Sequence, residues 1–411
     1  MILLSHPTGN ANIRNTARAF AEAGALAEFW TCLSWQPGGA VDRLLPAALR
    51  QQLARRSFPD LPSELVRTAP WRELGRFLAP RLGLSSLTRP ETGCFSVDAV
   101  YHGFDRAVAR RVRRAPALSG VYTGEDCALE TFQAARERGL HRFYDLPIGY
   151  WRAGQEIYRE EAAREPAWAE TLGGLTDSSR KLERKDAELR LAQTIVVASS
   201  FTRKTLDLAP ASLKDIRVIP YGAPPVRRPE VPLGGSGKLR VLFAGALGQR
   251  KGLSYLLEAM RTLGAAAELT LIGRKTSETC RPLNVAVRDH RWIPTLSHSE
   301  VLAEMGRHDV LVFPSLFEGF GLVLLEALSR GLPVVATEHT GAPDVLSDGV
   351  DGFIIPLRSA SAIAERLHLL ASDRTRLAAM KEAALATAGR LTWDKYRRRV
   401  AALATSSSIR S

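Results

Sequence analysis

Residues 312–327, VFPSLFEGFGLVLLEA, join an apolar run to an amphipathic run through a turn that contains two glycines. The apolar run that ends at Phe313 predicts a buried strand, and the run from Leu322 predicts a helix. Gly319 and Gly321 let the main chain turn tightly between the two and approach another group closely. A strand, a glycine turn and a helix in this order are typical of one unit of a parallel α/β sheet.

The same stretch predicts an anion site. We expect the turn to bring Glu318 to the carboxyl edge of the sheet, with the N–H groups of Gly321, Leu322 and Val323 directed outward at the start of the helix. Such N–H groups suit a phosphate. Glu326 falls in the first turns of the helix, from which its carboxylate can hydrogen-bond a pair of hydroxyls in the same pocket.

On both sides of this stretch, short apolar runs alternate with longer amphipathic ones, which is the pattern of parallel strands with crossover helices. The first series predicts strands at 2–5, 27–33, 98–101, 120–123, 141–145 and 194–198, with helices at 15–23 and 178–191. The second predicts strands at 239–245, 268–272, 310–313, 333–337 and 352–355, with helices at 253–263, 297–306, 322–329 and 361–371.

Prolines and glycines gather between residues 220 and 237 and mark the best domain boundary. The length of 411 residues also fits two domains. We therefore predict an α/β protein of two Rossmann-like domains, residues 1–218 and 219–394, that face each other across a cleft. Ligands bind at the carboxyl ends of the strands in such sheets.

Glu318 and Glu326, separated by seven residues around Gly-Phe-Gly, resemble the E-x7-E motif of the retaining glycosyltransferases of family 4, which have the GT-B fold. Phe313, Ser315 and residues 331–337 match the same pattern. Three more stretches resemble the family: 243–252 its strand and basic pair beside the donor pyrophosphate, 219–222 its interdomain linker, and 340–344 its donor-sugar loop. In this family the last helix, here 395–411, commonly packs back on the N-terminal domain.

The resemblance implies a role for each residue. Glu318 would contact the donor sugar, Glu326 the ribose, and Arg250 and Lys251 the diphosphate. The donor-binding set is Gly245, Gly319, Phe320, Gly321, Leu322, Val323 and Glu326. Two cations also make chemical sense without the resemblance, because a departing nucleoside diphosphate gains negative charge that preorganised cations stabilise.

The chain departs from the family at two positions. Ala246 stands where many members have an arginine, so Arg250 and Lys251 must supply the positive charge. Asp145 stands where many have a histidine, and we include it among the catalytic candidates. Acceptor-side candidates are Gly9, Asn10, Glu125 and Tyr150; for the region around Tyr150, a proline turn with a packed aromatic pair is an equal alternative.

The sequence contains no D-x-D pair, H-E-x-x-H, G-x-S-x-G or G-x-G-x-x-G motif, and 234–238 fails as a phosphate loop. We therefore expect no metal and no cofactor, with a nucleoside-diphosphate sugar as the donor substrate. The predicted function is metal-independent transfer of a sugar, of hexosyltransferase type and with retention, to a carbohydrate or lipid-linked acceptor, such as a precursor of a polysaccharide or glycolipid. The alternatives are a sugar-nucleotide epimerase or hydrolase, and a nonenzymatic protein that binds anions or nucleic acid.

The net charge of +13 is concentrated between residues 43 and 114, where 14 arginines face six carboxylates. Residues 71–78 predict a short helix with arginines between its apolar positions, either on a lipid interface or as a solvated basic cap. Nucleic acid is disfavoured because no binding motif accompanies the charge. The N-terminus predicts a strand rather than a signal peptide, and the four cysteines predict reduced thiols, so we expect a cytoplasmic protein, with an anionic inner membrane face as a possible partner.

Overall fold

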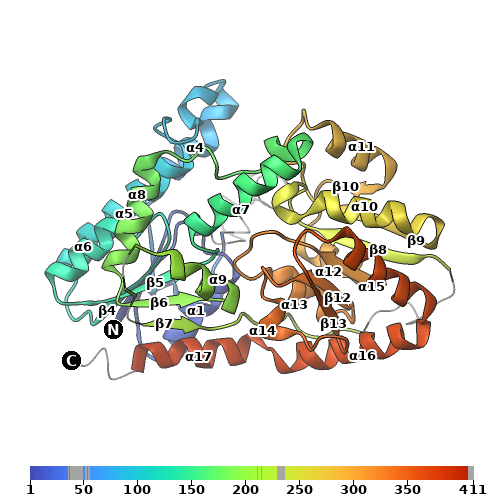
Figure 1. Ribbon diagram of the computed structural model, residues 1–411. Helices are drawn as coiled ribbons and strands as arrows, with labels where there is room; N and C mark the ends of the chain where they lie inside the picture. Colours follow the sequence, from blue (N-terminus) through green and yellow to red (C-terminus); the bar gives the residue numbers. More distant parts are fainter. Residues whose placement is uncertain are drawn as a thin grey trace.

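The computed structural model describes residues 1–35, 37, 50, 53, 56–210, 212, 213, 215–228 and 237–405. It contains two parallel sheets with helices packed around them (Figure 1). The first has the strand order β3-β2-β1-β4-β5-β6-β7 and the second the order β10-β9-β8-β11-β12-β13. This α/β architecture confirms the predicted fold class.

The first sheet is built from the N-terminal half. Its strands are β1 (Ile2–Ser5), β2 (Leu26–Thr31), β3 (Val66–Thr68), β4 (Gly120–Gly124), β5 (His141–Leu146), β6 (Thr194–Val197) and β7 (Ile216–Val218). The helices of this half are α1 (Ala11–Glu22), α4 (Trp71–Leu78), α5 (Val97–Arg114), α6 (Leu129–Glu137), α7 (Trp151–Arg164), α8 (Ser179–Leu191) and α9 (Ser200–Thr205).

The second sheet is built from the C-terminal half. Its strands are β8 (Leu239–Ala244), β9 (Ala267–Ile272), β10 (Arg291–Ile293), β11 (Val310–Phe313), β12 (Val334–Thr337) and β13 (Gly352–Ile355). The helices are α10 (Leu253–Leu263), α11 (Arg281–Asp289), α12 (His298–Met305), α13 (Leu322–Leu328), α14 (Ala342–Val345), α15 (Ala360–Ser372), α16 (Arg374–Arg390) and α17 (Trp393–Thr405).

The central strands of the second sheet are largely apolar. Every residue of β11 and β12 is buried, which is expected where helices cover both faces of a parallel sheet. This is why the apolar runs at 310–313 and 333–337 located strands well. The helix predicted at 71–78 is α4, and those at 253–263 and 322–329 are α10 and α13.

One predicted strand is wrong. Residues 98–101 lie in the first turns of α5, whose N-cap is Ser96, with its side chain accepting a hydrogen bond from Ala99 N–H at 3.0 Å. Val100, Phe104 and Val108 are buried along one face of this helix. A spacing of four residues between buried positions is typical of a helix. The predicted strand, residues 98–101, is too short to contain two such positions, so this periodicity was missed.

The predicted boundary at residue 218 falls at the end of β7, the last strand of the first sheet. The cluster that suggested this boundary falls partly at 229–236, outside the described residues. Beyond the second sheet, α16 leads into α17, which runs along α1 of the N-terminal half (Figure 1). Tyr396 and Thr16 share a hydrogen bond of 2.8 Å, and Arg397 Nη1 donates to Asn15 Oδ1 at 2.9 Å. The end of the predicted C-terminal segment, 406–411, lies outside the described residues.

Within the described residues, no helix is both long and apolar enough to cross a membrane. The basic stretch 43–114 is only partly described, since Arg43 and Arg55 lie outside the described ranges. Some of its charge is neutralised internally: Arg111 pairs with Glu28 at 2.6 Å and Arg113 with Glu137 at 2.9 Å.

Candidate active site

Glu318 lies between two cations at the carboxyl edge of the second sheet. Its Oε1 atom is 2.5 Å from Arg250 Nη1 and 2.5 Å from Lys251 Nζ. Arg250 also donates to the main-chain oxygen of Phe317 at 3.0 Å, which ties the loop after β8 to the loop after β11. The structure thus brings together all three residues that the resemblance places around the donor sugar and diphosphate.

Burial and the neighbouring charges shift the pKa values of Lys251 and Glu318. Burial lowers the pKa of Lys251 to about 8, and the neighbouring Arg250 charge adds to the effect, although Glu318 opposes it. Burial alone would raise the pKa of Glu318, but the charges of Lys251 and Arg250 hold that pKa below its ordinary value. The carboxylate therefore stays ionised, and the Lys251 ammonium, 4.7 Å from the Phe313 ring centroid, loses its proton near pH 8.

Two glycines of the donor-binding set have backbones that other residues rarely adopt. Gly245, at the end of β8, has a φ of 151°, and Gly321, before α13, has a φ of 86°. A Cβ on Gly321 would meet the Phe313 ring at 2.7 Å. These constraints account for the glycines structurally, and any contact of Leu322 and Val323 N–H groups with a phosphate remains a prediction.

Gly319 is a point of close contact between the two domains. A Cβ on this residue would lie 1.7 Å from the main-chain oxygen of Pro147, which follows β5 of the first sheet. Its own carbonyl accepts hydrogen bonds from Ser199 Oγ and, at 2.8 Å, from Thr202 Oγ1. The expected close approach thus exists, and its partner in this structure is the N-terminal domain.

The side chain of Phe320 is part of the core. It is 2% exposed, and its ring centroid lies 5.2 Å from that of Tyr221 in the linker. A donor would therefore meet Phe320 only through the main chain.

Glu326 lies on α13 with a partner that the sequence did not indicate. Its Oε1 atom is 2.9 Å from His298 Nε2, at the first residue of α12. The hydrogen bond to Glu326 raises the pKa of His298. A ribose that used this carboxylate would have to share it with His298 or displace the ring.

Asp145 lies at the carboxyl end of β5, two residues before Pro147. It is 5% exposed, and burial raises the pKa of its carboxyl to about 7. Its charge acts on the hydroxyls of Tyr122, Tyr221 and Tyr396, which come from three separate parts of the chain. Asp145 is thus a carboxyl that can carry a proton near neutral pH, close to where the two domains meet.

The loop after β1 is held by a histidine that the sequence analysis missed. His6 Nδ1 accepts the N–H groups of Gly9 at 2.9 Å and Thr8 at 3.1 Å. Burial, with help from Arg56, lowers the pKa of His6 to about 4, so the ring is neutral and able to accept. Asn10 accepts from Ile13 N–H at 3.2 Å and caps α1. A histidine directly after the first strand was the available signal.

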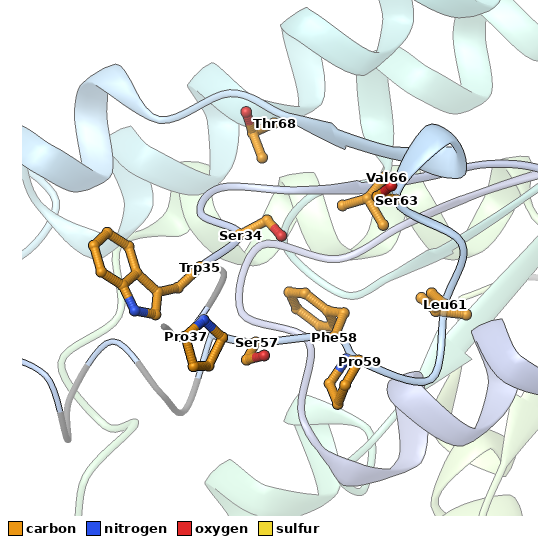
Figure 2. A pocket seen from close by; sticks show the side chains of 10 residues that line it. All are labelled: Ser34, Trp35, Pro37, Ser57, Phe58, Pro59, Leu61, Ser63, Val66 and Thr68. Atoms are coloured by element: carbon orange, nitrogen blue, oxygen red, sulfur yellow. The ribbon is translucent and has the colours of Figure 1, made fainter. Parts of the chain in front are cut away.

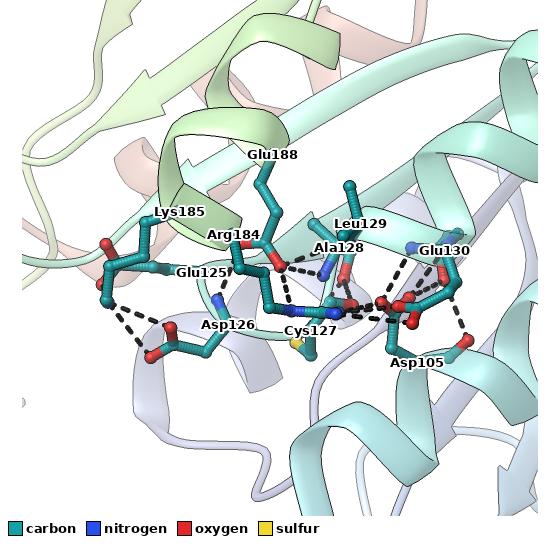
Figure 3. Close-up of polar contacts among 12 residues, drawn as sticks. Asp105, Glu125, Asp126, Cys127, Ala128, Leu129, Glu130, Arg184, Lys185 and Glu188 are labelled. Carbon is teal, nitrogen blue, oxygen red and sulfur yellow. Dashed lines mark hydrogen bonds and ion pairs between the residues drawn. The ribbon is translucent and has the colours of Figure 1, made fainter. Parts of the chain in front are cut away.

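Glu125 belongs to a charged network around the loop after β4 (Figure 3). Lys185 of α8 lies 3.0 Å from both Glu125 and Asp126, and Glu188 accepts the N–H groups of Asp126 and Ala128 at 2.9 and 3.0 Å. Burial raises the pKa of Glu188 to about 8. These contacts hold the loop in one conformation. The carboxylate of Glu125 forms an ion pair with Lys185.

The side chain of Tyr150 makes its contacts within the N-terminal domain. Its hydroxyl donates to Asp186 Oδ1 at 2.5 Å, and the same oxygen accepts from Trp151 Nε1 at 2.7 Å. The two aromatic rings lie 5.7 Å apart. These contacts are those of the packed aromatic pair, and they account for Tyr150 without a ligand.

Figure 2 shows the residues that line a cavity of about 430 Å³ in the N-terminal half. Trp35 and Phe58 contribute aromatic surface to it, and Ser34, Ser57 and Thr68 contribute polar groups. A Cβ on Gly9 would meet the Phe58 ring at 2.5 Å, so the cavity wall and the Gly9 loop are in direct contact.

Metal ligands are not grouped in the described part of the chain. There, no set of three or more His, Cys, Asp or Glu side chains is placed to hold a metal ion.

The part of the chain that forms the second sheet is similar to a known protein family. Residues 230–387 match the family model described as "Glycosyl transferases group 1". A glycogen synthase of Mycobacterium tuberculosis is 29% identical over 266 residues, which cover 62% of this chain and 61% of that protein. The chain spans less than two thirds of the length of the first curated relatives it matches. Residues 230–387 are thus similar to glycosyltransferase group 1 domains.

Solved structures match the whole chain. Sucrose-phosphate synthase from Thermosynechococcus elongatus has a TM-score of 0.69 at 17% sequence identity. The match covers 100% of this chain and 99% of that protein's chain. The fold is GT-B. HepE of Anabaena, solved in complex with UDP-glucose, has a TM-score of 0.63 at 15% identity and covers 98% of this chain and 99% of its own.

Proposed function

We propose that this GT-B protein transfers a sugar from a nucleoside-diphosphate sugar to an acceptor bound mainly by its N-terminal domain. The observation that carries the proposal is the position of Glu318 between Arg250 and Lys251, within a domain that matches glycosyltransferases group 1. Relatives named for sugar transfer, and HepE in complex with UDP-glucose, support a nucleotide sugar as the donor.

The proposed chemistry uses charges that the protein already holds in place. When the bond between sugar and diphosphate breaks, the leaving group gains negative charge. Arg250 and Lys251, held at the strand ends by Glu318 and by the Phe317 carbonyl, would stabilise this charge without a metal ion. Glu318 would be released from the cations as the diphosphate binds and would then contact the sugar.

Retention of configuration and membership of family 4 are parts of the proposal that rest on the E-x7-E resemblance of Glu318 and Glu326. For the acceptor we propose a carbohydrate or lipid-linked precursor of a polysaccharide or glycolipid. The cavity lined by Trp35 and Phe58 supports a carbohydrate, because aromatic faces and nearby hydroxyls are the surfaces that sugar rings contact. We propose a cytoplasmic reaction, which the free thiols of Cys32, Cys94, Cys127 and Cys280 support.

Release of nucleoside diphosphate from a panel of nucleotide sugars tests this function, with and without a mixture of lipid-linked and free oligosaccharides. We expect one donor to be consumed faster when acceptors are present, and Arg250→Ala to remove that activity. Product anomers resolved by NMR test retention. Equal release without acceptor would indicate a hydrolase, and conversion of the donor without release would indicate an epimerase.

A further inference from the structure

Helix α4 presents its apolar residues to solvent. Trp71 is 82% exposed, Leu74 is 37% exposed and Leu78 is 54% exposed. At 100° per residue these positions share one face of the helix. The segment stands at the periphery of the N-terminal domain, in light blue in Figure 1.

Glu73 of the same helix is directed inward, while Arg72 is exposed. Glu73 is 3% exposed and pairs with Arg56 at 2.7 Å and with Arg76 at 2.8 Å. A surface helix of a globular protein normally does the reverse, with its apolar stripe buried and its charges in water. The ion pairs of the buried Glu73 therefore help to hold α4 with Trp71, Leu74 and Leu78 towards solvent.

Two more exposed leucines follow the helix in the sequence. Leu82 is 70% exposed and Leu84 is 49% exposed in the turns that follow α4. Five exposed large apolar side chains within 14 residues are typical of an interaction surface rather than of scattered surface residues. We call the five residues Trp71, Leu74, Leu78, Leu82 and Leu84 the α4 face.

Exposed arginines lie close to the α4 face in the sequence. Arg67, Arg72, Arg81 and Arg89 are exposed, and Glu73, the single carboxylate in residues 66–90, is buried. An apolar centre with a tryptophan and a cationic rim complements the interface of an anionic bilayer. A second copy of this chain is a poor occupant, since a symmetric contact would bring the two cationic rims together.

We propose that the α4 face binds an anionic lipid membrane, with its apolar side chains inserted among the acyl chains and the arginines against the headgroups. This surface is separate from the Glu318 site, so membrane binding can be measured without enzymatic activity, and its failure would leave the proposed transfer untouched.

Cosedimentation with vesicles tests the proposal. We expect the full chain to bind vesicles of phosphatidylcholine with phosphatidylglycerol and to bind phosphatidylcholine alone far less. Leu78→Ser with Leu82→Ser should lower the affinity by about tenfold, because the apolar contact is lost. Val350→Ser is the matched control, as Val350 is an apolar residue of the C-terminal half that is 55% exposed.

The contribution of charge has its own pair of variants. Arg81→Glu with Arg89→Glu should weaken binding, and Arg110→Glu with Arg114→Glu should not. The control changes the charge equally on α5. Arg110 and Arg114 lie about 10 and 16 Å along this helix from Gly103, which is close to the Arg72 side chain, and these distances are about one and two Debye lengths in physiological salt.

Tryptophan fluorescence reports insertion directly. Brominated lipids should quench part of the emission of the seven tryptophans, and Trp71→Phe should abolish this quenching. Equal binding to neutral and anionic vesicles, unchanged binding of the α4-face variants, or a concentration-dependent dimer that these variants abolish would overturn the proposal.

Discussion

Lys251 Nζ lies 2.5 Å from Glu318 Oε1, and only about a tenth of each side chain is exposed. The opposite charge of each partner favours the ionised form of the other, in opposition to the effect of burial. The pair also places a cation and a carboxylate at the end of β8 and β11, where α/β sheets bind ligands. The cations of the proposed site are therefore already in place. In this structure they pair with the Glu318 carboxylate, where the site would bind the anionic diphosphate.

We predict that nucleoside diphosphate binding weakens above pH 8. With a pKa of about 8 in the free protein, Lys251 is charged below that pH and loses its charge above it. Affinity should fall about tenfold by pH 9, one decade for one unit beyond the pKa. In Lys251→Arg the charge persists, so titration calorimetry should show a flatter profile. Parallel profiles in the two proteins would contradict the assignment.

Gly319→Ala should destabilise the protein by about 1–3 kcal/mol, because its Cβ would overlap the Pro147 carbonyl and push the two domains apart. Gly389→Ala is the control: nothing lies within 4 Å of its Cβ position in α16, so the same change should stabilise by about 0.5–1 kcal/mol. Denaturant unfolding measures both. A Gly319 variant as stable as its Gly389 counterpart would rule out the close contact.

Asp145→Asn should raise stability at high pH. A carboxyl whose pKa rises from 3.8 to about 7 on folding favours the folded state at low pH and costs stability as pH rises through that window. The advantage of the variant over wild type should therefore grow between pH 4 and 7, to about 1–4 kcal/mol, and then level off. A constant difference across this range would show that Asp145 is not buried as a carboxyl.

Much of the fold could be predicted from local pattern. Strands such as 310–313 and 352–355 are continuous apolar runs, and their bounds match β11 and β13. The three-residue strands β3, β7 and β10 were missed, because so few residues give no periodicity and their pairing is set by neighbouring strands.

Some residues of the candidate site could also be predicted from the sequence, and others could not. Glu318, Arg250 and Lys251 lie in two short segments with recognisable spacing, and the structure brings them together. The partners His298 of Glu326 and Pro147 of Gly319 depend on tertiary packing between distant segments, which no local spacing reveals. Placement of these side chains needed the three-dimensional structure.

Excess EDTA should leave turnover unchanged. The proposed mechanism neutralises the diphosphate with Arg250 and Lys251, and the described residues contain no grouped metal ligands. Activity assays before and after dialysis against chelator measure this. Activity that disappears in EDTA and returns with magnesium or manganese would contradict the metal-free mechanism.

The central claim, that Arg250 and Lys251 form a nucleoside diphosphate site, is tested most directly by thermal shift with a panel of nucleoside diphosphates. A ligand at 100 times its dissociation constant stabilises the folded state by about 2.7 kcal/mol, so one member of the panel should raise the melting temperature of the wild-type protein by several degrees. The same nucleotide should leave the folded double variant Arg250→Ala, Lys251→Ala unchanged. An equal rise in both proteins, or no rise with any nucleotide, would contradict the account.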